Sequence, residues 1–168
     1  MMSALNDKLL VVTNGGSRAS FMEVGGQGSN QARLHQSFHL ERYAGPPAVQ
    51  TAGGMHTSPL VSIHLVAEYI VAVYETKVVI LKQSGELLQE IESSKLNPPA
   101  NSQNRFRYVK GAVNISGDHE VVLLASNTKD TKSAMQSQVL VLREKDPQEQ
   151  INELLGKGQI NEAQAVFA

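Results

Sequence analysis

The chain has 168 residues, of which 41% are hydrophobic and 18% are charged, and 15 basic residues against 16 acidic ones give a formal net charge of -1. This length suits one domain, or one domain with an appendage, and the balanced charge excludes a strongly basic nucleic-acid binder and an acidic solvating tail. Because the chain contains no cysteine, disulfide scaffolds, thiolate metal sites and cysteine nucleophiles are also excluded.

The N-terminal residues, from Met1 to Lys8, lack the basic start and the apolar stretch of a signal peptide. The longest apolar runs, such as Leu9 to Val12, are far shorter than the roughly 20 residues of a membrane span. We therefore expect a cytoplasmic protein whose contact with membranes is peripheral and indirect, through partners.

The first block of the chain predicts a β-hairpin, because two short apolar segments, Lys8–Thr13 and Ala19–Val24, surround the turn Asn14-Gly15-Gly16-Ser17. Residues 25–60 are rich in Gly, Gln, Ser and Pro and show little periodicity. We expect a long flexible insertion there, with one strand near Leu34–Leu40.

The next two blocks repeat one plan of short β-branched segments separated by turns, which favours strands over helices. The second block predicts four strands: Ser62–Val66, Tyr69–Tyr74, Lys77–Leu81 and Leu87–Ile91. The third block predicts strands at Arg107–Val113, Glu120–Ser126 and Gln138–Arg143. The apolar run of the second strand starts at Ile70 in one block and at Val121 in the other, positions that differ by 121 − 70 = 51 residues. Four-stranded units at such a period are typical of β-propeller blades, and two blocks also fit a small β-sandwich.

At Asp146 the pattern changes to helical. Asp146-Pro147-Gln148-Glu149 combines an N-cap acid, Pro at the first helical position and Glu at the third, and Gly156 and Gly158 provide a C-terminal stop. Asn161 is expected to cap a second helix. The residues Ile151, Leu154, Leu155, Val166 and Phe167 form an apolar stripe. One helix pair cannot bury such a stripe by itself, which is typical of the first step of an α-solenoid.

Three patterns in the sequence have the residue types of a binding site, and for each we favour a non-functional interpretation. His35 and His39, with Glu41 nearby, have the spacing of zinc ligands on a helix, but the segment lacks helical periodicity. The loop 25–30 is glycine-rich, but it has neither the Lys nor the following helix of a phosphate loop. The segment 104–110 interleaves basic and aromatic residues, a pattern of single-strand nucleic-acid binders. No catalytic set is apparent, and we expect no enzyme activity, no cofactor and no metal.

The join between the last strand and the first helix resembles a known family. Gln150-Ile151, Leu154-Leu155 and Asn161-Glu162-Ala163 are similar to the start of the α-solenoid in endolysosomal tethering subunits of the Vam/TGF-beta-receptor-associated-protein type, which belong to the HOPS and CORVET complexes. The segments 65–73 and 77–80 resemble two strands of the preceding citron-homology β-propeller. The resemblance covers residues 60–168. It departs from the family pattern at Glu68, which stands where the family has Pro, and in the looser segment 25–60.

The resemblance implies a non-catalytic scaffold in endosome-to-lysosome or vacuole trafficking that contacts other tethering subunits, a Rab-type GTPase and SNARE proteins, without nucleic acid. It predicts a partial propeller of about three blades over residues 1–145 and the start of a solenoid over 146–168.

The apolar stripe is the predicted partner surface, and packing of the stripe onto the chain's own last blade is the alternative. For the function, the alternative is a generic propeller or sandwich interaction module with no trafficking role. A seven-bladed ring needs about 280 residues, so we expect a fragment, a short isoform or a half completed by another chain.

Overall fold

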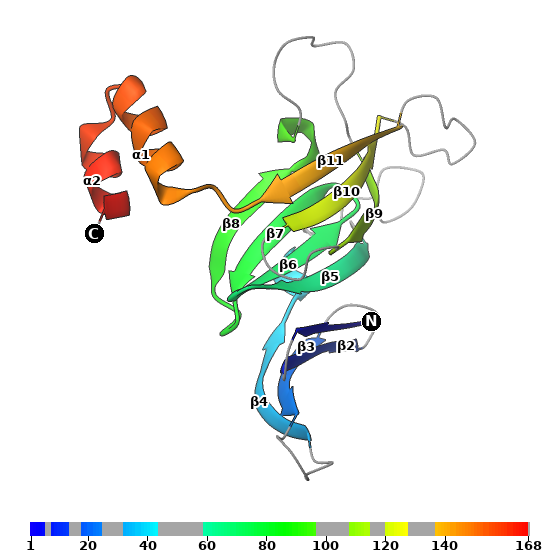
Figure 1. The fold of residues 1–168 in the computed structure, drawn as a ribbon. Helices are drawn as coiled ribbons and strands as arrows, with labels where there is room; N and C mark the ends of the chain where they lie inside the picture. The colour runs from blue at the N-terminus through cyan, green and yellow to red at the C-terminus, as the bar shows by residue number, and fades with distance from the viewer. Residues whose placement is uncertain are drawn as a thin grey trace.

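The structure, a computed structural model, describes residues 1–5, 8–13, 18–24, 32–43, 59–96, 108–114, 120–127 and 137–167. These residues form three antiparallel β-sheets followed by two α-helices (Figure 1). The predicted mainly β fold with C-terminal helices is therefore confirmed.

Each sheet is a meander in which strands that follow one another along the chain are neighbours. Sheet A contains β1 (Met2–Leu5), β2 (Lys8–Thr13), β3 (Arg18–Val24) and β4 (Ala32–His39). Sheet B contains β5 (Leu60–Val66), β6 (Tyr69–Tyr74), β7 (Lys77–Lys82) and β8 (Leu87–Glu92). In the described part of the chain, sheet C contains β9 (Tyr108–Val113), β10 (Glu120–Ser126) and β11 (Ser137–Arg143). Two short 3-10 helices, Glu41–Tyr43 and Ser93–Lys95, follow β4 and β8.

Sheet B lies between the other two sheets, and β6 is the strand that shows this most clearly. Its residues Ile70, Ala72 and Tyr74 belong to the core shared with sheet A, and Val71 and Val73 belong to the core shared with sheet C. A strand covered on both faces needs apolar residues at successive positions, which explains the unbroken apolar run in its sequence. Each fully buried Val, Ile or Leu contributes about 1.5–3 kcal/mol from burial of its side chain.

The first strands of the three sheets lie beside one another. β1 packs against β5, and β5 packs against β9. The three sheets are thus stacked with their first strands on the same side, and within each sheet the following strands lie successively farther from that side. The outward face of sheet C carries exposed apolar side chains from all three strands: Val113, Leu124, Val139 and Val141.

The helices α1 (Pro147–Gly156) and α2 (Ile160–Phe167) pack against each other and stand apart from the sheets (Figure 1). Asp146 caps α1 as predicted, since its side chain accepts hydrogen bonds from the backbone N–H groups of Gln148 at 2.7 Å and Glu149 at 3.4 Å. Gly158, at φ +73°, provides the left-handed residue between the helices. The second helix begins at Ile160, so Asn161 is inside it rather than at its cap.

The structure corrects the expectation for residues 25–60 in the part that it describes. A strand is present near the predicted position, but β4 is an integral strand of sheet A, and Phe38, Leu40 and Tyr43 are buried in the core between sheets A and B. Polar composition masked these few core residues, so insertion is the wrong description for 32–43. The remainder of that segment, 25–31 and 44–58, lies outside the described residues.

Candidate functional site

The described residues form a groove of about 670 Å³ between sheet B, the edge of sheet C and the start of α1. It exists because sheet C covers sheet B incompletely. β9 and β10 lie over β5 and β6, and β11, the third strand of sheet C, is its edge strand. The outer strands of sheet B therefore keep part of one face open. We call this hollow the edge groove.

The floor of the edge groove is apolar. It comes mainly from the face of sheet B that turns toward sheet C, with two residues of sheet C at the side, and consists of Val66, Val71, Ile80, Leu88, Ile91, Val121 and Leu142. Leu88 remains 44% exposed, and Ile80 and Ile91 are half-buried. An apolar surface of this kind is stabilised when another apolar surface covers it.

The rim of the edge groove is polar and charged. Gln89 lies on β8, Tyr69 on β6, and Arg143, Glu144 and Lys145 follow one another along the exit of β11. The Tyr69 hydroxyl donates a hydrogen bond to Glu144 Oε1 at 3.1 Å, and this bond, together with the carboxylate charge, raises the pKa of Tyr69.

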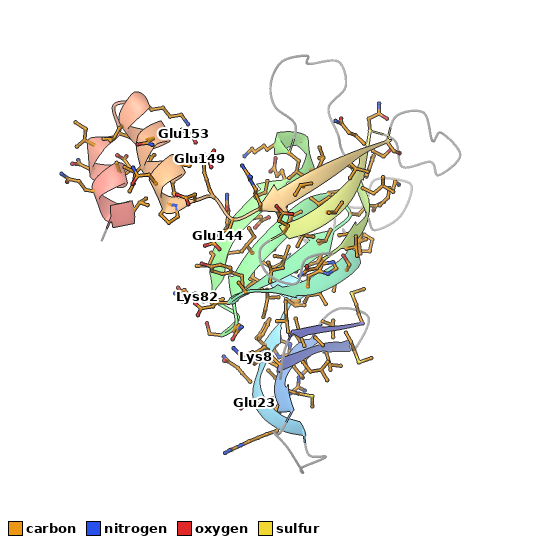
Figure 2. All side chains as sticks on the ribbon, viewed as in Figure 1. Lys8, Glu23, Lys82, Glu144, Glu149 and Glu153 are labelled. Atoms are coloured by element: carbon orange, nitrogen blue, oxygen red, sulfur yellow. The ribbon has the colours of Figure 1, made fainter. Side chains whose placement is uncertain are left out.

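From the rim, charged side chains continue into the helix: Glu144 lies on the connection between β11 and α1, and Glu149 and Glu153 lie in α1 (Figure 2). Lys145 forms an ion pair with Glu153. This pair is exposed and adds little stability, but it ties the connection to the second turn of α1. Gln150, in the first turn, lines the groove, so the position of α1 defines one end of the groove.

The residue types around the edge groove suit binding better than chemistry. Among the described residues that line it, one carboxylate, Glu144, stands beside Tyr69 and two basic side chains. General acid–base catalysis uses a group whose pKa lies near the working pH, and the upward shift at Tyr69 moves that phenol farther from neutrality. The lining has an apolar centre and a polar rim, an arrangement that is also typical of protein interfaces.

The predicted partner stripe on the helices is only partly exposed. Ile151, Leu154 and Val166 are half-buried, and Leu155 is 51% exposed. The side chain of Phe167 lies outside the described residues. At the contact between the two helices, Ala163 is 3% exposed, a small residue that lets the helices approach. Because the pair stands apart from the sheets, the stripe is not covered by the described part of sheet C, and its role in binding stays a prediction.

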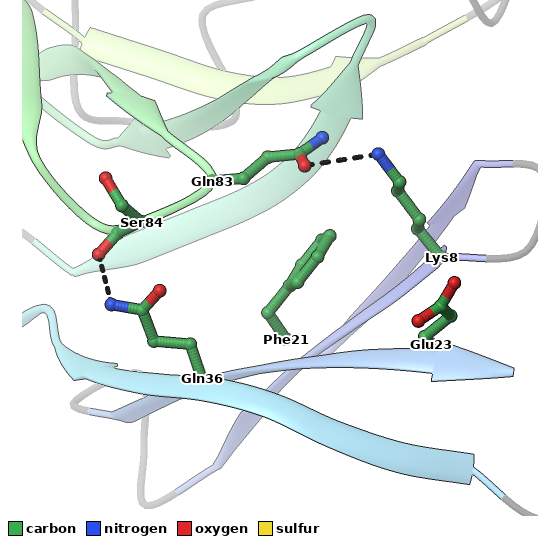
Figure 3. Close-up of a pocket in the computed structure, with 6 residues that line it drawn as sticks. All are labelled: Lys8, Phe21, Glu23, Gln36, Gln83 and Ser84. Carbon is green, nitrogen blue, oxygen red and sulfur yellow. Dashed lines mark hydrogen bonds between the residues drawn. The ribbon is translucent and has the colours of Figure 1, made fainter.

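Two smaller hollows mark the seam between sheets A and B. One of about 270 Å³ is lined by Lys8, Phe21, Glu23, Gln36, Gln83 and Ser84 (Figure 3). Lys8 Nζ donates to Gln83 Oε1 at 3.3 Å, and Gln36 Nε2 donates to the Ser84 carbonyl at 2.7 Å. A second, of about 530 Å³, lies on the other side of the same β7–β8 turn. These contacts hold the turn against sheet A, so we interpret the first hollow as a structural seam.

The structure separates the histidines that could have formed a metal site. His35 and His39 would share one face only on a helix, and the segment is a strand, as its lack of helical periodicity indicated. In a strand, residues four apart are about 13 Å from each other. The His35 side chain and the Glu41 side chain lie outside the described residues. In the described part of the chain, no group of three or more His, Asp and Glu side chains could hold a metal ion.

The other two sequence patterns are described in part or not at all. The glycine-rich loop 25–30 lies outside the described residues, as do Arg105, Phe106 and Arg107. Lys110 Nζ lies 5.2 Å from the centre of the Tyr108 ring, a cation–π contact within β9. His64 is half-buried in β5, with Nε2 3.0 Å from Ser62 Oγ. Its burial lowers the pKa of His64.

Comparison with known proteins does not assign the chain to a family. No family model matches it, and no curated protein matches it significantly. One solved structure is similar, with a TM-score of 0.42 and 16% sequence identity. It comes from a study of two prolyl endopeptidases and of the role of inter-domain dynamics in catalysis and specificity. The match covers 83% of this chain and 17% of that one. Neither helix in the described part is long and apolar enough to cross a membrane.

Proposed function

We propose that this chain is a non-catalytic scaffold in membrane tethering between endosomes and lysosomes or vacuoles, peripheral on the cytoplasmic side. It acts through contacts with other tethering-complex subunits and a Rab-type GTPase. The observation that carries the proposal is the passage from the last strand into a helix pair across residues 144–146, in the segment that resembles the tethering family. The apolar edge groove and the partly exposed helix stripe supply two surfaces for partners.

The finer fold in this proposal is a partial β-propeller that continues into the first step of an α-solenoid. Three antiparallel meanders that stack face to face, with β1, β5 and β9 beside one another, fit consecutive blades around one axis. The exposed apolar face of sheet C, with Val139 61% and Val141 56% exposed, fits a surface against which a further blade packs.

The proposal is tested by affinity capture from cells with the tagged chain. We expect recovery of tethering-complex subunits or of a Rab-type GTPase in its GTP form. Leu155→Asp should remove capture if the helix stripe is the docking face. Leu87→Asp is the matched control, since Leu87 is an exposed leucine, 43% exposed, that does not line the edge groove. Recovery of neither class of partner by the unaltered chain would reject the tethering function.

A further inference from the structure

We propose that the edge groove binds an extended peptide segment of a partner protein, which adds to β11 as a fourth, antiparallel strand of sheet C and places alternate apolar side chains on the groove floor. This inference deepens the proposed scaffold function, on which it rests, by naming the binding mode and the chemistry of the ligand.

The first argument is the unused edge of β11. In the described part of the chain, β11 pairs with β10 along its whole length, from Ser137↔Ser126 to Arg143↔Glu120, and with no other strand. Its other edge presents backbone donors and acceptors to any segment that lies beside it. Such an edge is a template for pairing, and strand addition to an exposed edge is a recurrent mode of peptide recognition.

The second argument is the position of the groove relative to that edge. Sheet B has a fourth strand, β8, where sheet C has none in the described part. The open face of β7 and β8, with Ile80, Leu88 and Ile91, therefore lies beside β11 and forms the groove floor. A segment paired with β11 would occupy the fourth position of sheet C over this floor. The neighbouring strand pairs described in the three sheets are antiparallel, and we infer the same direction for the ligand.

The third argument concerns the alternative of a helical ligand. A helix satisfies its own backbone groups, so a helix seated on the groove floor would cover the edge of β11 without pairing it. Buried backbone groups without partners cost about as much as a lost hydrogen bond each. A strand covers the same floor and pairs the edge as well. Since a strand turns every second side chain to one face, the ligand is a segment with apolar residues at alternate positions.

The experiment uses the full chain and a phage-displayed library of random twelve-residue peptides as the probe. We expect the selected peptides to share apolar residues at every second position. Bound to the protein, they should slow the exchange of alternate backbone amides between Gln138 and Arg143, measured by NMR. Enrichment of no peptide, peptides with helical spacing, or binding without this two-residue pattern of protection would overturn the proposal.

A matched pair of variants locates the site. Leu88→Glu places a charge on the groove floor, and Leu124→Glu places the same charge on the outward face of sheet C, at exposed fractions of 44% and 42%. We expect Leu88→Glu to weaken peptide binding at least tenfold and Leu124→Glu to change it less than twofold. Equal effects would reject the groove. The peptide selection needs no cellular partner, so the two proposals can fail separately. Selected peptides that bind the groove, together with failed capture in cells, would reject the tethering function and keep the strand site. Capture of tethering partners in cells, together with a failed peptide selection, would keep the tethering function and reject the strand site.

Discussion

The β7–β8 turn joins sheets A and B, and Gly85 is the residue on which we base the most quantitative prediction. Gly85 has φ +86°, and a Cβ atom built on it would lie 2.6 Å from Phe38 Cγ and 2.9 Å from Phe38 Cβ. The Gly85 carbonyl also accepts a hydrogen bond from Arg42 Nη2 at 3.0 Å. The residue thus sits where sheet A approaches the turn most closely, and a side chain there has neither a suitable backbone conformation nor space.

For Gly85→Ala we expect two costs. The left-handed conformation costs an alanine about 1–2 kcal/mol, and forcing an extra carbon into a packed contact costs about 1–3 kcal/mol. The smaller freedom of the unfolded chain returns about 0.4–1 kcal/mol. The free energy of unfolding should therefore fall by about 1–4.6 kcal/mol, a large part of the 5–15 kcal/mol typical of a domain. Urea denaturation followed by circular dichroism in the β-sheet region measures this change.

Two further variants separate the causes. Gly111→Ala is the matched control, because Gly111 lies in β9 without a positive φ, and a Cβ atom added to it would have no other atom within 4 Å. This control should be neutral or stabilising by up to about 1 kcal/mol. A Phe38→Ala background removes the ring carbons, including Cγ at 2.6 Å, and keeps only the contact with Cβ at 2.9 Å, so Gly85→Ala should cost less there than in the unaltered chain. If Gly85→Ala changes stability by less than about 0.5 kcal/mol, or costs as much without the Phe38 ring, the packing argument is wrong.

Two other predictions concern His64 and Asp146. Because burial lowers the pKa of His64 in the folded state, the unfolded state binds more protons as the pH falls below the ordinary histidine pKa of 6.5. The free energy of unfolding should therefore decrease as the pH falls below about 6.5. In urea titrations at several pH values, His64→Gln should make the free energy of unfolding depend less on pH in this interval. An unchanged pH dependence would reject His64 as the cause. Asp146→Ala removes the cap of α1 and should cost about 1 kcal/mol, visible as faster amide exchange in α1 with unchanged exchange in β6. Slower or equal exchange in α1 would contradict the capping role.

Most strands of this fold can be predicted from the sequence because the signal for each strand lies within its own segment. Residues 62–91 place short β-branched runs between turns such as Glu75-Thr76, and the structure has β5 to β8 at these positions. The missed strand is β1, Met2–Leu5, which is short and contains no β-branched residue. Its pairing with β2, for example Met2↔Val11, is a tertiary contact with no strong local pattern.

The candidate site is harder to predict from the sequence, because it depends on how two sheets overlap. Leu88 and Ile91 belong to a strand that the sequence predicts, but nothing in their spacing says that sheet C stops short of them. The signal that could have found the groove is the strand count. The second block has four predicted strands and the third has three, and stacking of two such blocks leaves part of one face of the second uncovered.

The same overlap links the two candidate partner surfaces. The exit of β11 through Arg143, Glu144 and Lys145 forms the rim of the edge groove, and the next residues begin α1, whose Gln150 lines the groove and whose Leu155 is exposed. A segment antiparallel to β11 would begin beside Arg143 and so would pass the first turn of α1 as it enters the groove. A partner whose strand extends beyond that point reaches the helix stripe without a change in the fold. One continuous partner chain could then occupy both surfaces, and the second contact would gain from the high effective concentration that the first provides.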